Sequence, residues 1–324
     1  MRVLLITFVE NINNPLHKKT LGGRVKGLML ALLASFALLF SGCVSQPSQQ
    51  GGKLQVVASF YPMYDFAKNV GGDRVEVTSL IPTGVEPHDF EPTPSDIKTL
   101  SSARVLVLNG VIEDAWAPKL LEGIDNPNLT VVDASRGVRL VASEDADTPG
   151  NDPHIWLDPV NAKKQVANIR DALEKADPDG KDYYEANANA YMAKLDALDS
   201  EFRATMATCK NKNMIITHAT LAYFCKEYGC KQVPVEGVNA EGEPTPQVVA
   251  AIVEQARAKN ITVVFVEKLY SPRVAQTIAN EIGGKVAVFN TMHGLTIEEQ
   301  QRGEDYLSQQ EENVATIKAN LDCG

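Results

Sequence analysis

The chain has 324 residues, of which 44% are hydrophobic and 22% are charged, and its formal net charge at pH 7 is −10. This length allows one large domain or two medium ones, and the composition excludes a disordered chain and a small disulfide-stapled scaffold. Nucleic acid is not an expected partner, because no lysine- or arginine-rich run occurs beyond the N-terminus of this acidic chain. The single long apolar stretch lies near the start, which excludes a polytopic membrane protein.

Residues 1–42 have the pattern of an export signal. The apolar segment 27–40 follows a basic run and precedes a Ser-Gly-Cys sequence that ends at Cys43. A basic start, a short apolar core and small residues before a cleavage point are typical of such signals. The cysteine after Ser-Gly resembles the acylated cysteine of lipoproteins, so we expect a lipid on Cys43 and a flexible tether over 43–53. An uncleaved membrane anchor is the alternative, although the apolar run is short for a span. In both cases the rest of the chain is expected outside the cytoplasm.

Four cysteines lie beyond this point: Cys209, Cys225, Cys230 and Cys323. An even number in an oxidising compartment is compatible with two disulfides, in three pairings. Cys225 and Cys230 are close enough to close a short loop, in which case Cys209 would meet Cys323. The alternative is that some remain free buried thiols. Their spacing does not match a zinc finger.

Alternating strand and helix patterns fill residues 54–180. Strands are expected at 54–60, 74–81, 104–109 and 129–133, and helices at 61–70, from 94 onward and at 159–176. The second of these helices begins with a capping box formed by Thr93 and Asp96 around Pro94. Such βαβ alternation predicts a mostly parallel sheet with helices on its faces.

Residues 181–207 contain neither glycine nor proline, which predicts one uninterrupted helix. Such a helix would span about 40 Å at 1.5 Å per residue, a length that suits a rigid spacer. The pattern then restarts, with strands at 213–217, 233–238, 261–267 and 285–289 and helices at 219–228, 247–259, 272–282 and 304–321. We therefore expect an α/β fold of two lobes, 54–180 and 208–324, with mostly parallel sheets joined by the helix 181–207.

Beyond residue 42 the chain has four histidines, which are His88, His154, His218 and His293. They are too far apart in the sequence for a local metal motif. Each lies in a loop at a predicted strand end or helix start, and ligands gather beyond the carboxyl ends of strands in open α/β sheets. Because neutral imidazoles suit Zn²⁺ in a tetrahedral site, we expect a metal site in the cleft between the lobes. The alternative for each histidine alone is a hydrogen-bonded surface or core residue.

Two further side chains are candidates at the same sheet edge. Glu267 ends a predicted strand and is a candidate metal ligand or an acceptor that orients an imidazole. The alternative is that it is a helix-capping or surface carboxylate. Asn290 likewise follows a strand. Prolines bound the loops around His88 and His154 and restrict the backbone there.

Six segments carry a family resemblance. They are VVASFYPMYDFAKNVGGDRVEVTSLIPTGVEPHDFEPTPSDI at 56–97, Asn109-Gly110 with Trp116, DPHIWLDP at 152–159, IITHATLAYF at 215–224, FVEKLYSP at 265–272 and GEDYL at 303–307. In this order they resemble the metal-binding lipoproteins of zinc and manganese ABC importers, the ZnuA-like and TroA-like solute-binding proteins. The resemblance covers nearly the whole chain from Val56 onward and implies two α/β lobes joined by one long helix, with the metal between them.

By this resemblance His88, His154 and His218 are metal ligands. Manganese-preferring members carry a carboxylate at the position of His218, so the resemblance implies Zn²⁺ rather than Mn²⁺, and Mn²⁺ does favour oxygen donors. Many relatives have an aspartate at the position of Asn290. The fourth ligand is therefore open between His293, Glu267, Asn290 and water. The stretch 141–152 lacks the histidines that zinc-binding relatives often carry there, and it is expected to be a solvated acidic loop, with weak attraction of cations as the alternative.

The resemblance implies a monomeric receptor outside the cytoplasm that is held to the membrane by its lipid and is not an enzyme. It would capture Zn²⁺ and deliver it to an ABC permease and its ATPase. A zinc-dependent hydrolase is one alternative, with Glu86 or Glu267 as general base beside an open zinc position, but no hydrolase motif accompanies them. A cell-surface adhesin on the same fold is the other.

Overall fold

The computed structural model describes residues 52–110, 114–143, 150–238 and 244–324. The export signal predicted at 1–42, the lipidated Cys43 and most of the tether predicted at 43–53 lie outside the described residues. Among the helices that the described residues form, none has both the length and the apolar character that a membrane crossing requires.

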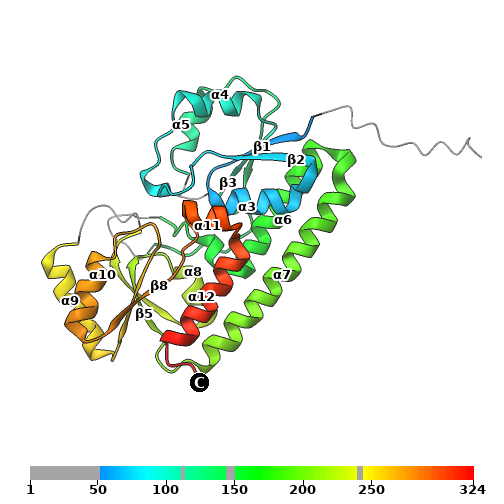
Figure 1. The fold of residues 1–324 in the computed structure, drawn as a ribbon. Coiled ribbons are helices and arrows are strands. Elements are labelled where there is room, and N and C mark those ends of the chain that lie inside the picture. The colour runs from blue at the N-terminus through cyan, green and yellow to red at the C-terminus, as the bar shows by residue number, and fades with distance from the viewer. Residues whose placement is uncertain (1–51, 111–113, 144–149, 239–243) are drawn as a thin grey trace, which may run out of the picture. The chain divides into compact units, whose positions relative to one another are not determined.

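The first sheet has four parallel strands in the order β2-β1-β3-β4 (Figure 1). The strands are β1 Leu54–Ala58, β2 Val75–Ser79, β3 Val105–Leu108 and β4 Thr130–Asp133. The helices are α3 Tyr61–Gly71, α4 Pro94–Ser102, α5 Ala117–Glu122 and α6 Pro159–Ala176. Short 3-10 helices are η2 Gly72–Arg74, η3 Pro87–Asp89 and η4 Ile155–Leu157. The predicted strand and helix alternation is confirmed.

Helices cover both faces of this sheet because its central strands are apolar on both sides. Val105 and Val107 of β3 pack in the same cluster as α3 and α6, whereas Leu106 and Leu108 pack with α4 and α5. This alternation is the two-residue period of a strand, and a strand buried on both faces is a continuous apolar run. α4 begins with the predicted capping box, in which Asp96 accepts the backbone N–H of Thr93 at 2.7 Å.

The helix α7, Lys181–Thr208, follows the 3-10 helix η5, Pro178–Gly180. Its 28 residues extend about 42 Å. Buried side chains recur every three or four residues along one face: Tyr184, Ala188, Tyr191, Leu195, Leu198, Phe202 and Met206. This face packs against α3 and α6 at one end and against α12 and α8 toward the other (Figure 1). The Gly- and Pro-free segment is thus the single helix that joins the lobes.

The second sheet repeats the strand order of the first, as β6-β5-β7-β8, and all its pairs are parallel. The strands are β5 Asn213–His218, β6 Lys231–Glu236, β7 Val263–Val266 and β8 Lys285–Val288. The helices are α8 Ala222–Tyr228, α9 Pro246–Ala258, α10 Arg273–Ile282, α11 Ile297–Arg302 and α12 Tyr306–Asn320. β1 and β3 are the central strands of the first sheet, and β5 and β7 are the central strands of the second.

Two short helices, α5 and α11, are absent from the sequence prediction. Each has six residues, which is too short to show an apolar period. α11 does carry a capping box, formed by Thr296 and Glu299, but its outward face is polar and Ile297 is exposed. A further difference concerns β6, which begins two residues before the predicted strand.

One hydrophobic cluster extends through both lobes. It contains Phe60 and Phe66 of the first lobe, Phe202 of α7, and Phe224 and Phe289 of the second lobe. Two disulfides lie in the second half of the chain, Cys209–Cys323 and Cys225–Cys230, which is the pairing considered from the sequence. The first ties the end of α7 to the C-terminus, and the shared core ties the lobes to each other.

Candidate metal centre

Four imidazole rings meet where the strand-end loops of the two sheets come together. The ring centroids of His88, His154, His218 and His293 lie 5.2–5.8 Å apart in every pairing. One nitrogen of each ring belongs to a group of four atoms that all lie within 4.8 Å of one another. Nitrogens around tetrahedral Zn²⁺ are about 3.4 Å apart, given Zn–N distances near 2.0–2.1 Å. A small inward movement of the rings would therefore complete a four-nitrogen coordination shell.

The loop before η4 holds His154 by hydrogen bonds on both its backbone and its ring. Asp152 Oδ1 accepts the backbone N–H of His154 at 2.9 Å and lies 3.0 Å from its ring Nδ1. Asn109, the residue after β3, donates its amide to the carbonyl of Pro153 at 2.9 Å and accepts from Gln165 of α6 at 2.8 Å. These buried contacts anchor the histidine to the first sheet and to the helix behind it.

His218 is the last residue of β5, and a carboxylate orients its ring. Glu267 follows β7, the neighbouring strand, and its Oε1 lies 2.5 Å from Nδ1 of His218. The same oxygen accepts the hydroxyl of Thr217 at 2.6 Å, and Oε2 accepts the hydroxyl of Thr291 at 2.7 Å. The structure therefore places Glu267 on the outer side of the His218 ring, where it acts as an acceptor for Nδ1.

His293 reaches the cluster through a strained turn after β8. Met292 is buried and has a φ of 61°, a left-handed conformation that non-glycine residues rarely adopt. Its backbone N–H donates to the side-chain oxygen of Asn290 at 2.8 Å. Trp156 donates its indole N–H to the carbonyl of Thr291 at 2.8 Å, and its ring lies 5.2 Å from that of His293. The turn is held from both lobes, and it directs the fourth imidazole inward.

The rings offer nitrogens suited to a metal ion. Nε2 of His88, of His154 and of His218 is buried and has no hydrogen-bond partner. Burial, together with the neighbouring imidazoles, lowers the pKa of His88 and of His154 well below the ordinary histidine value. These two rings are therefore neutral at pH 7, and a neutral imidazole is the form that binds a metal.

Two buried carboxyl groups, Glu267 and Glu86, lie near the rings. Burial raises the pKa of Glu267, but His218 and His293 outweigh it and hold the pKa below its usual range, so Glu267 is ionised. Both carboxylate oxygens of Glu86 are buried, and burial raises the pKa of this group. Glu86, Glu267 and His293 line one small pocket. Imidazole ligands bring no negative charge of their own, so the ionised Glu267 offsets part of the cost of desolvating Zn²⁺.

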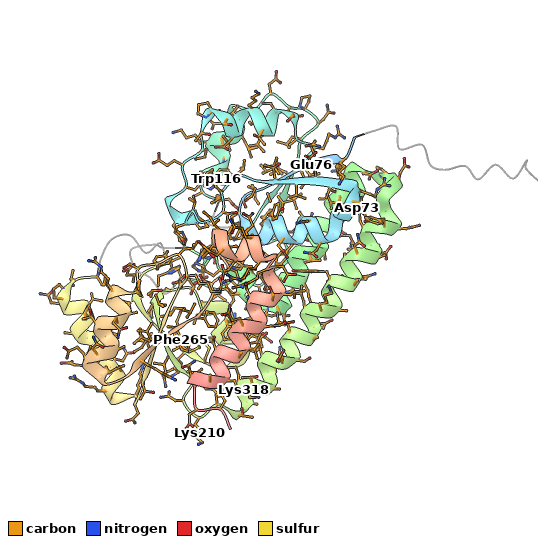
Figure 2. All side chains as sticks on the ribbon, viewed as in Figure 1. Asp73, Glu76, Trp116, Lys210, Phe265 and Lys318 are labelled. Carbon is orange, nitrogen blue, oxygen red and sulfur yellow. A yellow bond between two sulfur atoms is a disulfide. The ribbon has the colours of Figure 1, made fainter. Side chains whose placement is uncertain are left out.

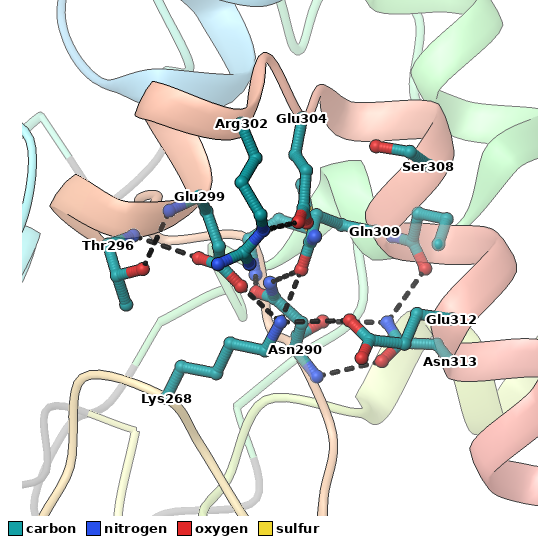
Figure 3. A network of polar contacts seen from close by, with 12 residues as sticks. Lys268, Asn290, Thr296, Glu299, Arg302, Glu304, Ser308, Gln309, Glu312 and Asn313 are labelled. Atoms are coloured by element: carbon teal, nitrogen blue, oxygen red, sulfur yellow. Dashed lines mark hydrogen bonds and ion pairs between the residues drawn. The ribbon is translucent and has the colours of Figure 1, made fainter.

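Asn290 belongs to a separate polar network (Figure 3). Its amide nitrogen donates to Gln309 of α12 at 2.5 Å, and its backbone N–H donates to Asn313 at 2.8 Å. The ammonium of Lys268 contacts the same Gln309 oxygen at 2.6 Å. Among the four alternatives for the fourth ligand, the structure brings His293 into the imidazole cluster and directs the Asn290 side chain to α12.

The sequence does not predict the residues that hold the rings or their loops in place, chiefly Asn109, Asp152 and Thr291. Asp152 precedes His154 by two residues, which is a spacing that permits the observed double acceptor. Asn109 follows a buried strand, as His218 ends one, and that position is the available signal for it. No sequence signal links Thr291 to Glu267, because their contact depends on how the loop after β8 turns.

Comparisons with known proteins agree with this geometry. The family model described as "Zinc-uptake complex component A periplasmic" matches residues 56–320. The high-affinity zinc uptake system protein ZnuA of Bacillus subtilis (strain 168) is 37% identical over 308 residues, which cover 90% of this chain and 97% of that protein.

Two solved structures have a similar fold. The Zn(II)-bound ZnuA-like domain of Streptococcus pneumoniae AdcA has a TM-score of 0.74 and 35% identity, covering 84% of this chain and 100% of that domain. The laminin-binding protein Lmb of Streptococcus agalactiae, described as a bifunctional protein with adhesin and metal transporting activity, has a TM-score of 0.76 and 28% identity. Its match covers 83% of this chain and 99% of that chain.

Proposed function

The chain belongs to the ZnuA family of zinc-uptake components, and from that premise we propose that it is the solute-binding component of an ABC importer. In this proposal it captures one Zn²⁺ between its lobes, outside the cytoplasm, and delivers it to the membrane permease, whose transport the partner ATPase drives. The observation that carries the proposal is the convergence of four imidazoles, from loops far apart in the sequence, with buried donor nitrogens.

We assign the four ligands to His88, His154, His218 and His293. Asp152 and Glu267 accept the Nδ1–H of two of these rings, which fixes the tautomer that leaves Nε2 for the metal. A shell of nitrogens favours Zn²⁺ over Mn²⁺, which prefers oxygen donors. Glu267 and Asn290 are supporting residues in this assignment, and water is not needed as a fourth ligand.

A closed four-nitrogen shell also separates this proposal from the hydrolase alternative. A catalytic zinc keeps one coordination position for water, whereas a site with four protein ligands is closed. Capture and release need only that the ligand loops part. The backbone N–H of Gly84 donates to the carbonyl of Leu295 at 3.1 Å, which joins the loop that carries His88 to the loop that carries His293. Release therefore involves displacing these loops, since the continuous core and α7 oppose a wide opening of the lobes.

The remaining parts of the proposal concern the ends of the chain and its organisation. We propose that residues 1–42 are an export signal, that Cys43 carries a lipid, and that residues 43–53 are the tether. Lobes 54–180 and 208–324, joined by the helix 181–207, then act as one monomeric receptor. Mass spectrometry of the membrane-extracted protein tests the lipid, and an unmodified Cys43 would contradict it.

Isothermal titration of chelator-treated protein with Zn²⁺ at pH 7 tests the site. One tight site is expected in the wild type, and each of the four His→Ala variants should lose more than about 100-fold in affinity, beyond the loss typical for residues that only orient ligands. Asp196→Asn, an exposed carboxylate on α7, is the matched control and should bind as the wild type does. Wild-type affinity in all four variants would overturn the assignment.

Two measurements address the alternatives. Hydrolysis of ester or phosphoester substrates that stops on chelation would favour a hydrolase. Binding to an extracellular matrix protein that persists in the four His→Ala variants would favour an adhesin.

A further inference from the structure

A cavity of about 810 Å³ lies beside the imidazole cluster. Its walls come from α3, from the start of α7, from the loop after β2 and from the segment that joins α11 to α12. Among the residues that line it is His293, which is also a member of the imidazole cluster. A volume of this size is typical of a ligand site, and here the wall is shared with a metal centre.

The cavity leads from solvent to a buried floor. Tyr183 is 40% exposed, and Asp73, near it in the structure, is also exposed. Two other lining residues are buried: Asp65 is 5% exposed and His293 is 3% exposed. Residues of both kinds line the same space, so the cavity connects the surface to the side of the cluster where His293 lies.

The lining is rich in oxygen atoms and in negative charge. Its carboxylates are Asp65, Asp73, Glu304 and Asp305, and the described lining residues include one basic side chain, Lys68. The Lys68 ammonium lies 5.6 Å from the centre of the Tyr64 ring. Arg302 lies outside the lining and contacts Glu304 at 2.6 Å. With Glu304 paired, Asp65, Asp73 and Asp305 outnumber Lys68, so the potential in the cavity is negative. The hydroxyl and amide groups of the lining are oxygen ligands that suit hydrated dications.

The charge of Asp305 acts on Asp65, and both side chains line the cavity. Burial first, and then the charge of Asp305, raise the pKa of Asp65 to about 6, while hydrogen bonds from Tyr191 at 2.8 Å and Asn69 at 3.1 Å hold the carboxylate in place. Two carboxylates from α3 and from the start of α12 therefore face a common volume.

We propose that this cavity is the vestibule through which a hydrated divalent cation reaches the imidazole cluster. Its carboxylates concentrate the ion, and the wall formed by His293 passes it from oxygen ligands to nitrogen ligands. The inference rests on the proposed function, because it assigns the route by which the cluster is filled. The vestibule is a transient site that is distinct from the four-nitrogen site.

Stopped-flow mixing of the metal-free protein with Zn²⁺ tests the vestibule. Trp156 is the reporter, because its ring lies 5.3 Å from His154 and 5.2 Å from His293. The test variant is Asp73→Asn/Asp305→Asn. Asparagine at 305 keeps the N-cap of α12, where Asp305 accepts the backbone N–H of Ser308 at 2.8 Å. The control is Glu122→Gln/Glu254→Gln, which makes the same change in net charge on exposed faces of α5 and α9.

The test variant should bind Zn²⁺ with an association rate constant roughly tenfold lower at low ionic strength, with a dissociation rate constant within about twofold of wild type. Added salt should slow the wild type and the control strongly and the test variant weakly. A wild-type association rate in the test variant, or an equal loss in the control, would overturn the vestibule. A faster dissociation alone would also overturn it, since that result means damage to the cluster. Absence of tight Zn²⁺ binding by the wild type would instead overturn the proposed function.

Discussion

The imidazole cluster and the acidic group formed by Glu299, Glu304 and Glu312 both hold their potential metal ligands close together. In each, the potential ligand atoms lie within 4.8 Å of one another. In the acidic group, the ammonium of Lys268 contacts both Glu299 and Glu312, the latter at 2.9 Å, and also Gln309 (Figure 3). In the imidazole cluster, Nε2 of three rings has no hydrogen-bond partner.

This contrast indicates that the balance of hydrogen-bond donors and acceptors, more than the number of ligand-type side chains, makes a metal site. The carboxylates of the acidic group are already neutralised by cations of the protein itself, and a metal ion would have to displace them. Asp152 and Glu267 lie against the outer nitrogens of two rings, His154 and His218, whose inner Nε2 atoms have no hydrogen-bond partner. Figure 2 shows charged side chains elsewhere on the ribbon, among them Glu76, Lys210 and Lys318, and these three are exposed.

Removing the internal cation of the acidic group should have the largest effect. Lys268→Met keeps the aliphatic stem and removes the ammonium, which leaves Glu299, with a side chain 4% exposed, without its ionic partner. Breaking a buried pair costs about 3–5 kcal/mol, to be measured as the free energy of unfolding in urea without metal. Glu312→Gln removes a partner that is 58% exposed and should cost less than about 1 kcal/mol. Equal small losses would contradict the role assigned to Lys268.

Zinc should stabilise the fold through the cluster and independently of the acidic group. At free Zn²⁺ of 100 times Kd, the wild type should gain about 2.7 kcal/mol in the free energy of unfolding. His154→Ala, with its lower affinity, should gain less than about 0.4 kcal/mol at that concentration, whereas Lys268→Met should show the full gain above its own lower baseline. Loss of the zinc effect in folded Lys268→Met would mean that the two groups are coupled.

Weakening the acceptors behind the rings should have a smaller effect than removing a ring. In Asp152→Asn and Glu267→Gln, the affinity for Zn²⁺ should fall about 10- to 100-fold, because the rings lose the charge that fixes their tautomer and raises their basicity. Titration calorimetry measures the loss, with Asp196→Asn as the remote carboxylate control. Unchanged affinity in both variants would show that the carboxylates do not orient ligands.

Acid should affect the cluster and leave the acidic group unchanged. The pKa values of His88 and His154 lie well below the ordinary 6.5, so both rings stay neutral down to pH 6.5, and protons compete with Zn²⁺ for them only at lower pH. In the acidic group, burial disfavours the charges of both Lys268 and Glu299. Their contact nevertheless holds the pKa of Lys268 above the ordinary lysine value and the pKa of Glu299 below the ordinary glutamate value. The difference in unfolding free energy between wild type and Lys268→Met should therefore be no larger at pH 5 than at pH 8, because burial raises the pKa of the unpaired Glu299 in the variant and acid relieves its charge, while Zn²⁺ affinity falls over the same range. Urea unfolding at pH 8, 7, 6 and 5 measures the first quantity, and Zn²⁺ titration calorimetry at the same pH values measures the second.

Most of the architecture could be predicted because its signals are local. The buried run of β3, the capping box at Thr93 and the absence of glycine and proline from α7 each act within one segment. α5 and α11 could not be predicted in this way, because six residues bury too little surface to impose a period and their helices depend on neighbouring elements.

The histidines show where local information ends. Their residue type and their place at strand ends predict a shared metal site, since parallel strands of one sheet end at one edge. The choice among His293, Asn290 and Glu267 depends on side-chain direction, which no spacing records. One left-handed residue, Met292, turns His293 inward while Asn290 bonds to α12.

The sequence alone determined the kinds of ligand, the two parallel sheets and the long helix between them, because composition, period and caps act over a few neighbouring residues. The tertiary structure alone decided which polar groups meet, as Lys268 meets Glu299 and Glu312 across 31 and 44 residues. It also decided which nitrogens remain without a hydrogen-bond partner. The physical reason is that a buried polar group is satisfied or left unsatisfied by distant parts of the chain, and those contacts form only when the lobes pack together.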